Sequence, residues 1–152
     1  MGASPILTRL RAVNGTGPAP LITLGFQAAG LVNVLGVLLF SKAFTNETLI
    51  SRSPVVFSRF GLVCIILWGL AYLAVARRYR EVPLLVAVFA VEKFVYTGTW
   101  ITWISRHGSE LPRLFAESPL AGVFYVIYGP NDFLFGPFFA AVAARELGRS
   151  PS

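Results

Sequence analysis

The feature that most constrains this chain is a set of four long apolar runs, each followed by a short polar segment. The runs cover residues 21–40, 55–76, 83–104 and 122–144. A transmembrane helix needs about 20 apolar residues, whereas a membrane-spanning strand needs about 10 and alternates apolar with polar side chains. The runs are continuous and have the length of helices. They predict an all-α membrane protein in which residues 1–152 form one domain, a four-helix transmembrane bundle.

The low charge of the chain agrees with this prediction. Only 13% of the residues are charged and 55% are hydrophobic, whereas an ordinary soluble domain carries about 25% charged residues. This composition argues against a soluble enzyme, a disordered tail, a coiled coil and a zinc module. The net charge is +6. Most of the basic residues flank apolar runs instead of forming one exposed face, so we expect no nucleic-acid partner.

A cleaved leader is the alternative interpretation of the first apolar run. Ser41-Lys42-Ala43 follows that run and has the small-x-small form of a signal-peptidase site. The run is longer than the roughly 7–15 residues of a signal-peptide core, and three further runs follow it. We therefore expect it to remain in the protein as the first membrane span.

Basic residues in the connecting segments predict the orientation of the bundle, because short cytoplasmic loops of membrane proteins are enriched in Lys and Arg. With four spans, one side carries both chain ends and seven basic residues: Arg9, Arg11, Arg77, Arg78, Arg80, Arg145 and Arg149. The opposite side carries four: Lys42, Arg52, Arg106 and Arg113. We expect both termini in the cytoplasm, with the protein in the inner membrane of a bacterium.

Three ionisable residues near the middle of their runs predict a charged cluster inside the bundle. They are Glu92, Lys93 and Asp132. A charge at the centre of a membrane helix costs roughly 2.5–3.5 kcal/mol, so these residues must face one another or water. Glu92 and Lys93 are adjacent and therefore point about 100° apart around the helix. We expect Lys93 to pair with Asp132 and Glu92 to be the protonatable group, although the cluster could also serve only to set helix register.

Arg59 is a further candidate for this cluster. It lies about one helical turn inside the second run, so it either reaches inward and completes charge neutrality or extends to the membrane surface. Asn33 belongs to a stripe of small residues on the first run, with Gly25 and Ala29, and such stripes let helices approach closely. We expect Asn33 to point into the bundle, where it either makes a polar contact that holds two helices together or belongs to the polar cluster.

The third run carries polar and aromatic residues on the helix face that contains Glu92. Steps of three and four residues lead from Glu92 to Tyr96, Thr99 and Trp103, with Trp100 alongside. This face could form a pocket wall that stacks against a ligand and hydrogen-bonds it. The alternative for the two tryptophans is an aromatic belt at the membrane surface. Tyr96 lies too deep for such a belt, so its hydroxyl needs a partner.

The fourth run contains two helix-disturbing motifs, Gly129-Pro130-Asn131-Asp132 and Gly136-Pro137. Each proline lacks a backbone donor and clashes with the carbonyl four residues earlier, so we expect the fourth helix to be kinked or broken at Gly129-Pro130. Broken helices at mid-membrane depth mark binding sites in transporters. In the alternative interpretation, Asn131 or Asp132 caps the second half of a broken helix.

No signature of a cofactor or metal site stands out in the sequence. His107, the only histidine, follows the third run, and Cys64, the only cysteine, lies among aliphatic residues. Histidine clusters that bind haem or metals are therefore excluded, and neither a P-loop nor a dinucleotide-binding fingerprint is present. We expect no cofactor and no bound metal.

These observations predict a polar pocket at mid-membrane depth that binds a small or lipid-like ligand, or that belongs to an accessory subunit of a larger membrane complex. Its candidate residues are Glu92, Lys93, Asp132, Asn131, Tyr96, Asn33, Trp100 and Arg59. Two alternatives remain open. One is a membrane enzyme in which Glu92 or Asp132 moves a proton on an apolar substrate. The other is a proton-coupled transporter of small molecules that works as a homodimer.

Overall fold

The computed structural model describes residues 18–149, and all regular structure in that range is helical. Four helices are long: α2 (Pro20–Phe40), α4 (Arg59–Val75), α5 (Pro83–His107) and α7 (Pro119–Leu147). The short elements are α3 (Glu47–Arg52), the 3-10 helix η1 (Gly108–Glu110) and α6 (Leu111–Glu117). The all-α prediction, with four long helices, is confirmed. Arg9 and Arg11, which entered the orientation argument, lie outside the described residues.

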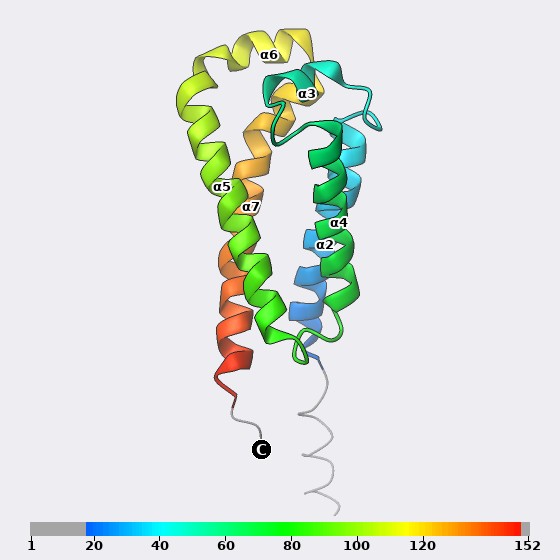
Figure 1. Cartoon of the computed structure of the whole chain (residues 1–152), viewed down its shortest axis with the longest axis vertical. Helices are drawn as coiled ribbons and strands as arrows, with labels where there is room; N and C mark the ends of the chain where they lie inside the picture. Colours follow the sequence, from blue (N-terminus) through cyan, green and yellow to red (C-terminus); the bar gives the residue numbers. More distant parts are fainter. Residues whose placement is uncertain (1–17, 150–152) are drawn as a thin grey trace, which may run out of the picture.

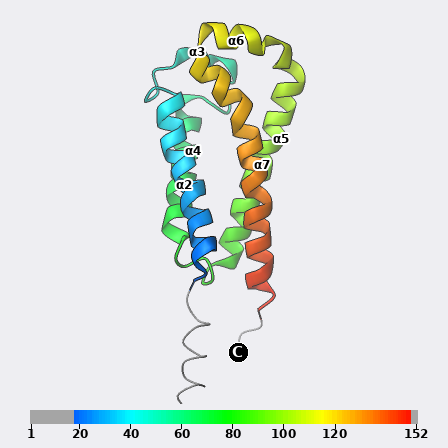
Figure 2. The same ribbon diagram turned by 180° about the vertical axis from the view of Figure 1, so that it is seen from behind.

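The long helices run alternately up and down and form two antiparallel pairs (Figure 1). α2 packs mainly against α4, and α5 mainly against α7. The helices α3 and α6 cover one end of the bundle, which we call the cap end, and the described chain begins and ends at the opposite, open end (Figures 1 and 2). α2 and α7 lie next to each other on the face seen in Figure 2, and they also make contact.

Helix starts follow local sequence rules. Proline occupies the first turn of α2, α5 and α7, where its missing N–H has no helical partner to lose. Ser58 caps α4 by accepting a hydrogen bond from the Gly61 N–H, and Ser118 caps α7 by accepting one from the Ala121 N–H. The polar residues of the fourth run are therefore not needed as caps.

The fourth helix is not broken. α7 is continuous from Pro119 to Leu147 with Pro130 and Pro137 in its interior, and it curves along its length (Figure 2). Of the two expected forms, kinked or broken, the break is therefore wrong. The interpretation of Asn131 or Asp132 as a cap is also wrong, because both residues lie within the helix. α5 supports the disturbed turn: the Trp100 indole N–H donates to the Tyr125 carbonyl at 2.8 Å. Neighbouring helices can satisfy carbonyls around a proline in this way.

Small residues allow close packing, and Asn33 of the expected stripe takes part, because a Cβ on Gly69 would lie 2.8 Å from the Cβ of Asn33. A Cβ built on Gly25 or Gly136 would meet an aromatic ring, that of Phe138 or Phe94, rather than a helix backbone. The close backbone approach joins α2 to α4, since a Cβ on Gly30 would lie 2.7 Å from the carbonyl oxygen of Gly69. These two glycines therefore set how closely the α2–α4 pair can pack.

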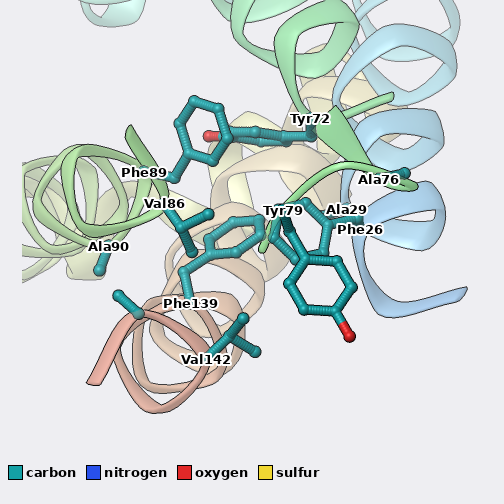
Figure 3. Packing of buried hydrophobic residues seen from close by; sticks show 11 residues of the cluster. Phe26, Ala29, Tyr72, Ala76, Tyr79, Val86, Phe89, Ala90, Phe139 and Val142 are labelled. Atoms are coloured by element: carbon teal, nitrogen blue, oxygen red, sulfur yellow. The ribbon is translucent and has the colours of Figure 1, made fainter. Parts of the chain in front are cut away.

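The interior has two hydrophobic clusters. The open-end cluster is built from rings of all four long helices, including Phe26, Tyr72, Phe89 and Phe139 (Figure 3). The cap-end cluster contains Phe57, Phe124, Tyr125, Tyr128 and Trp103. The charged residues of the third and fourth runs lie between the two clusters.

Two segments have the length and hydropathy of membrane spans, α2 and the stretch Pro83–Glu117 that contains α5. α4 is apolar but has 17 residues. By length and composition alone, the structure thus supports two candidate spans rather than four. Buried helices of soluble proteins and signal sequences near the N-terminus can have the same properties.

Candidate functional site

A buried polar cluster joins the two helix pairs at mid-height. Lys93 on α5 is 1% exposed. Its Nζ lies 2.6 Å from Oδ1 of Asp132 on α7 and 3.1 Å from Oδ1 of Asn33 on α2. The ion pair expected between Lys93 and Asp132 is present, and Asn33 joins the cluster. The Asn33 amide also donates to the Ile65 carbonyl of α4 at 3.3 Å, so the cluster contacts every long helix.

Glu92 turns to a different partner from Lys93, as expected for adjacent helical residues. Its carboxylate accepts a hydrogen bond from the hydroxyl of Tyr72 on α4. The Lys93 Nζ lies 4.0 Å from Glu92 Oε2 and 5.3 Å from the centroid of the Tyr72 ring. Sequence reasoning did not single out Tyr72. A tyrosine near the end of an apolar run also fits a membrane surface, so only its burial shows that it belongs to the cluster.

The charges of the cluster do not balance. One amine faces two carboxylates, Glu92 and Asp132, and the cluster carries one excess negative charge when both are ionised. Arg59 does not supply the missing positive charge, because it lies at the first turn of α4 and pairs there with Glu47. The expectation that Arg59 could reach inward is therefore wrong. Its position at the end of a helix lets the long side chain extend away from the bundle.

A cavity of about 80 Å³ lies beside the cluster, between the two helix pairs. The expected pocket residues Asn33, Glu92, Lys93, Tyr96, Asn131 and Asp132 all line it. The Asn131 amide donates to Asp132 Oδ1 at 3.2 Å. The remaining lining is mostly apolar and aromatic, with contributions from Val32, Gly36, Val37, Phe40, Phe57, Ile65, Phe124, Ile127 and Tyr128.

Tyr128 lines this cavity, and its hydroxyl oxygen is fully buried. The side chain is 7% exposed, and among residues 18–149 its oxygen has no hydrogen-bond partner. An unsatisfied buried polar group costs about 1–3 kcal/mol, and most such groups in folded proteins are paired. Sequence reasoning did not identify Tyr128, because it lies one turn before Asp132 in a run that already contains several aromatic residues.

The aromatic face of α5 does not form one pocket wall. Only Glu92 and Tyr96 from that face line the cavity. Trp100 lies outside the lining and covers Gly129, where an added Cβ would come within 2.0 Å of the indole. Trp103 is 8% exposed, and its ring centroid lies 4.2 Å from that of Tyr125. The belt interpretation is therefore wrong for Trp103, which belongs to the interior.

An ion-pair network outside the cavity joins the short helices of the cap end. Arg52 on α3 contacts Glu110 at 2.9 Å and Glu117 at 2.6 Å, and Arg113 contacts Glu117 at 2.8 Å. Hydrogen bonds from Arg52 and Arg113 lower the pKa of Glu117 below its ordinary value, because they stabilise the ionised carboxylate. This network connects α3 to α6.

No metal-binding group is evident in the part of the chain that the structure describes, where no three His, Cys, Asp or Glu residues come together. Comparison with family models, with curated proteins and with solved structures found no match. The function must therefore be argued from the geometry of the cavity.

Proposed function

We propose that this chain is a four-span integral membrane protein that binds a small lipid-soluble ligand in the cavity beside the Lys93–Asp132 pair. The observation that carries the proposal is the combination, around one cavity, of an apolar lining, the Lys93–Asp132 ion pair and Tyr128, whose hydroxyl has no partner among residues 18–149. Ligand pockets typically combine apolar walls with a few convergent polar groups.

The outward faces of the long helices support the membrane assignment. Large apolar side chains on each of them are more than half exposed, for example Leu35, Leu67, Val91 and Leu134. In water this exposure would be unfavourable by about 25 cal/mol per Å² of apolar surface, and continuous patches of this kind mark interaction sites. A hydrocarbon environment around the whole bundle removes that cost.

The two helices that fall short of a membrane span by composition also fit this assignment. α4 has 17 residues, which correspond to about 25 Å of helix, a modest mismatch with a hydrocarbon core of about 30 Å. α7 is longer, with 29 residues, and owes part of its polarity to Asn131 and Asp132. Because Asp132 is buried against Lys93, this polarity does not face the lipid.

The orientation proposed from basic residues rests on a small difference. The cap end carries Lys42, Arg52, Arg106 and Arg113, and the structure adds Arg59 to them. The opposite side carries Arg77, Arg78, Arg80, Arg145 and Arg149 among the described residues. Arg9 and Arg11, which the sequence assigns to the same side, lie outside the described part. We place that side in the cytoplasm and the protein in a bacterial inner membrane.

Photolabelling in membranes tests the proposed function. A lipid-soluble compound carrying a diazirine should label cavity residues such as Phe57 and Tyr128, and excess unlabelled compound should suppress that labelling. Labelling of the lipid-facing Leu67 and Leu134 provides the internal control, because contact with bulk lipid does not saturate. Equal persistence of labelling at both kinds of position would contradict a binding site.

The excess carboxylate supports a second candidate function, proton-coupled transport. Glu92 lines the cavity and is the carboxylate that Lys93 does not pair with closely. A group of this kind inside a membrane can hold a proton in exchange for a substrate. Proton-driven uptake into sealed vesicles that is lost in Glu92→Gln would favour this candidate over simple binding.

A further inference from the structure

The cavity reaches the outer surface of the bundle between α2 and α7. Two of its lining residues are strongly exposed, Val32 on α2 at 45% and Ile127 on α7 at 42%. Gly36 lines the cavity one turn after Val32, and a Cβ added there would meet no atom within 4 Å. These three residues therefore border an opening of the cavity on the face that α2 and α7 form. In a membrane, that face meets lipid hydrocarbon.

The size of the cavity restricts how much of a ligand it can hold. Its volume of about 80 Å³ is well below the roughly 300–1,000 Å³ of pockets that enclose a whole drug-sized molecule. A ligand would place only its polar head and the first carbons of its chain inside. The rest of an apolar chain would remain in the bilayer, which requires an opening toward lipid of the kind found between α2 and α7.

The charges in the cavity wall disfavour a charged head group. An anion would meet two carboxylates, and Lys93 already donates to Asn33 and Asp132. A cation is attracted by the excess negative charge only while Glu92 is ionised, and this attraction disappears when Glu92 holds a proton. A cation would also compete with Lys93 for Asp132 and with Tyr72 for Glu92. The Tyr128 hydroxyl has no partner among the described residues, and its oxygen is fully buried. A neutral oxygen of a ligand can pair with it after a small shift of the ring toward the cavity, and no existing hydrogen bond of that hydroxyl has to break.

We propose, resting on the function proposed above, that the ligand is an uncharged amphiphile with an alcohol or ketone oxygen, which enters from the lipid between α2 and α7 and hydrogen-bonds Tyr128. The opening beside Gly36 is the access route, and the Tyr128 hydroxyl is the anchor for the head group.

Three photoreactive probes of equal chain length test the ligand class in membranes containing the full-length protein. One ends in a primary alcohol, one in a trimethylammonium group and one in a sulfate. We expect saturable labelling of the cavity by the alcohol, with at least tenfold weaker binding of both charged probes. Preferential binding of either charged probe would overturn this inference and leave the proposed binding function intact. Absence of saturable labelling by all three would contradict both.

Two matched pairs of variants test the anchor and the access route. Tyr128→Phe should weaken binding of the alcohol probe about fivefold, the typical effect of one neutral hydrogen bond. Tyr125→Phe is its control, because the Tyr125 hydroxyl donates to the Leu49 carbonyl and Tyr125 does not line the cavity.

For the access route, Gly36→Leu should reduce binding at least tenfold by filling the opening. Gly98→Leu is the control, since a Cβ at Gly98 also meets nothing within 4 Å and Gly98 lies outside the cavity lining. Thermal unfolding checks that all four variants remain folded. Unchanged binding in Tyr128→Phe overturns the anchor, and unchanged binding in Gly36→Leu overturns the access route.

Discussion

The open-end and cap-end clusters are both built from aromatic rings, but only rings of the cap-end cluster line the cavity. In the open-end cluster, the ring centroids of Phe26 and Phe139 lie 5.0 Å apart, and those of Tyr72 and Phe89 lie 4.8 Å apart. In the cap-end cluster, Phe57 lies at similar distances from Phe124 and Tyr128, 4.9 Å and 4.8 Å. The cap-end rings nevertheless border an 80 Å³ cavity beside charged groups.

This difference teaches that the cavity is not a general result of packing large rings. Similar distances between rings occur in a cluster whose rings do not line the cavity. The cap-end half combines space with the Lys93–Asp132 ion pair and with a tyrosine hydroxyl that has no partner among residues 18–149. A cluster that served only to set helix register would need the ion pair but not the adjoining space.

The largest expected effect is at the boundary between the two halves. Lys93→Met leaves Asp132 and Glu92 as buried carboxylates without their amine and should destabilise the bundle by about 3–5 kcal/mol. The double variant Lys93→Met/Asp132→Leu should recover much of that loss, because apolar replacement of a buried ion pair is often tolerated. Thermal unfolding in detergent measures both. A single variant as stable as the double would show that the pair is not coupled.

A second prediction compares one ring from each cluster. Phe89→Ala opens space in the open-end cluster and should lower the free energy of unfolding by about 3 kcal/mol or more, since Phe89 is fully buried. Phe124 borders the existing cavity, so Phe124→Ala should lower the free energy of unfolding by a smaller amount. The same substitution should enlarge the cavity for bulkier ligands. Chemical or thermal unfolding gives the two stabilities, and photolabelling with a branched probe tests the enlargement. Equal losses of stability at both positions would remove the distinction between the open-end cluster and the cap-end cluster.

A third prediction concerns the close helix approach on which the packing depends. Gly69→Ala places a Cβ within 2.9 Å of the Gly30 carbonyl oxygen and should cost about 1–3 kcal/mol through overpacking. Gly98→Ala is the matched control, because space is open there and alanine favours the helix by up to about 1 kcal/mol. Opposite signs of the two melting-temperature shifts are expected. A stabilising Gly69→Ala would mean that the pair can separate without loss.

The smallest effect is expected at the exposed network of the cap end. The pKa of Glu117 is lowered by Arg52 and Arg113, so its contribution to stability is present above the unfolded-state pKa of about 4.3 and is lost as pH falls through the lowered value. Glu117→Gln should therefore lower the melting temperature slightly at neutral pH and leave it unchanged at pH 2–3. A difference that grows in acid would contradict this origin. High salt should also reduce the difference.

Sequence reasoning was most successful where the physical cost was large and independent of neighbours. The insertion cost of lone charges required Lys93 to find a carboxylate, and Asp132 was the available partner on another helix. The angular separation of adjacent helical residues likewise required Glu92 to face elsewhere. The approximate positions of the four long helices follow from the apolar runs, and first-turn prolines mark the starts of α2, α5 and α7. α4 begins at Arg59, four residues after the start of its run, where Ser58 caps it.

Tertiary contacts decided what local rules left open. Pro130 would weaken an isolated helix, but α7 stays continuous. Trp100 of α5 packs there and donates to the Tyr125 carbonyl in the turn before Pro130. In the sequence, Tyr72 and Tyr128 resemble other aromatic residues of the apolar runs. The packing of the helices places the Tyr72 hydroxyl on Glu92 and leaves the Tyr128 hydroxyl without a partner among residues 18–149. The sequence by itself determined which residues are helical and which charges must meet. Only the packing of the helices decided where space remains, because helical periodicity relates residues within one helix and carries no information about the rotation of its neighbours.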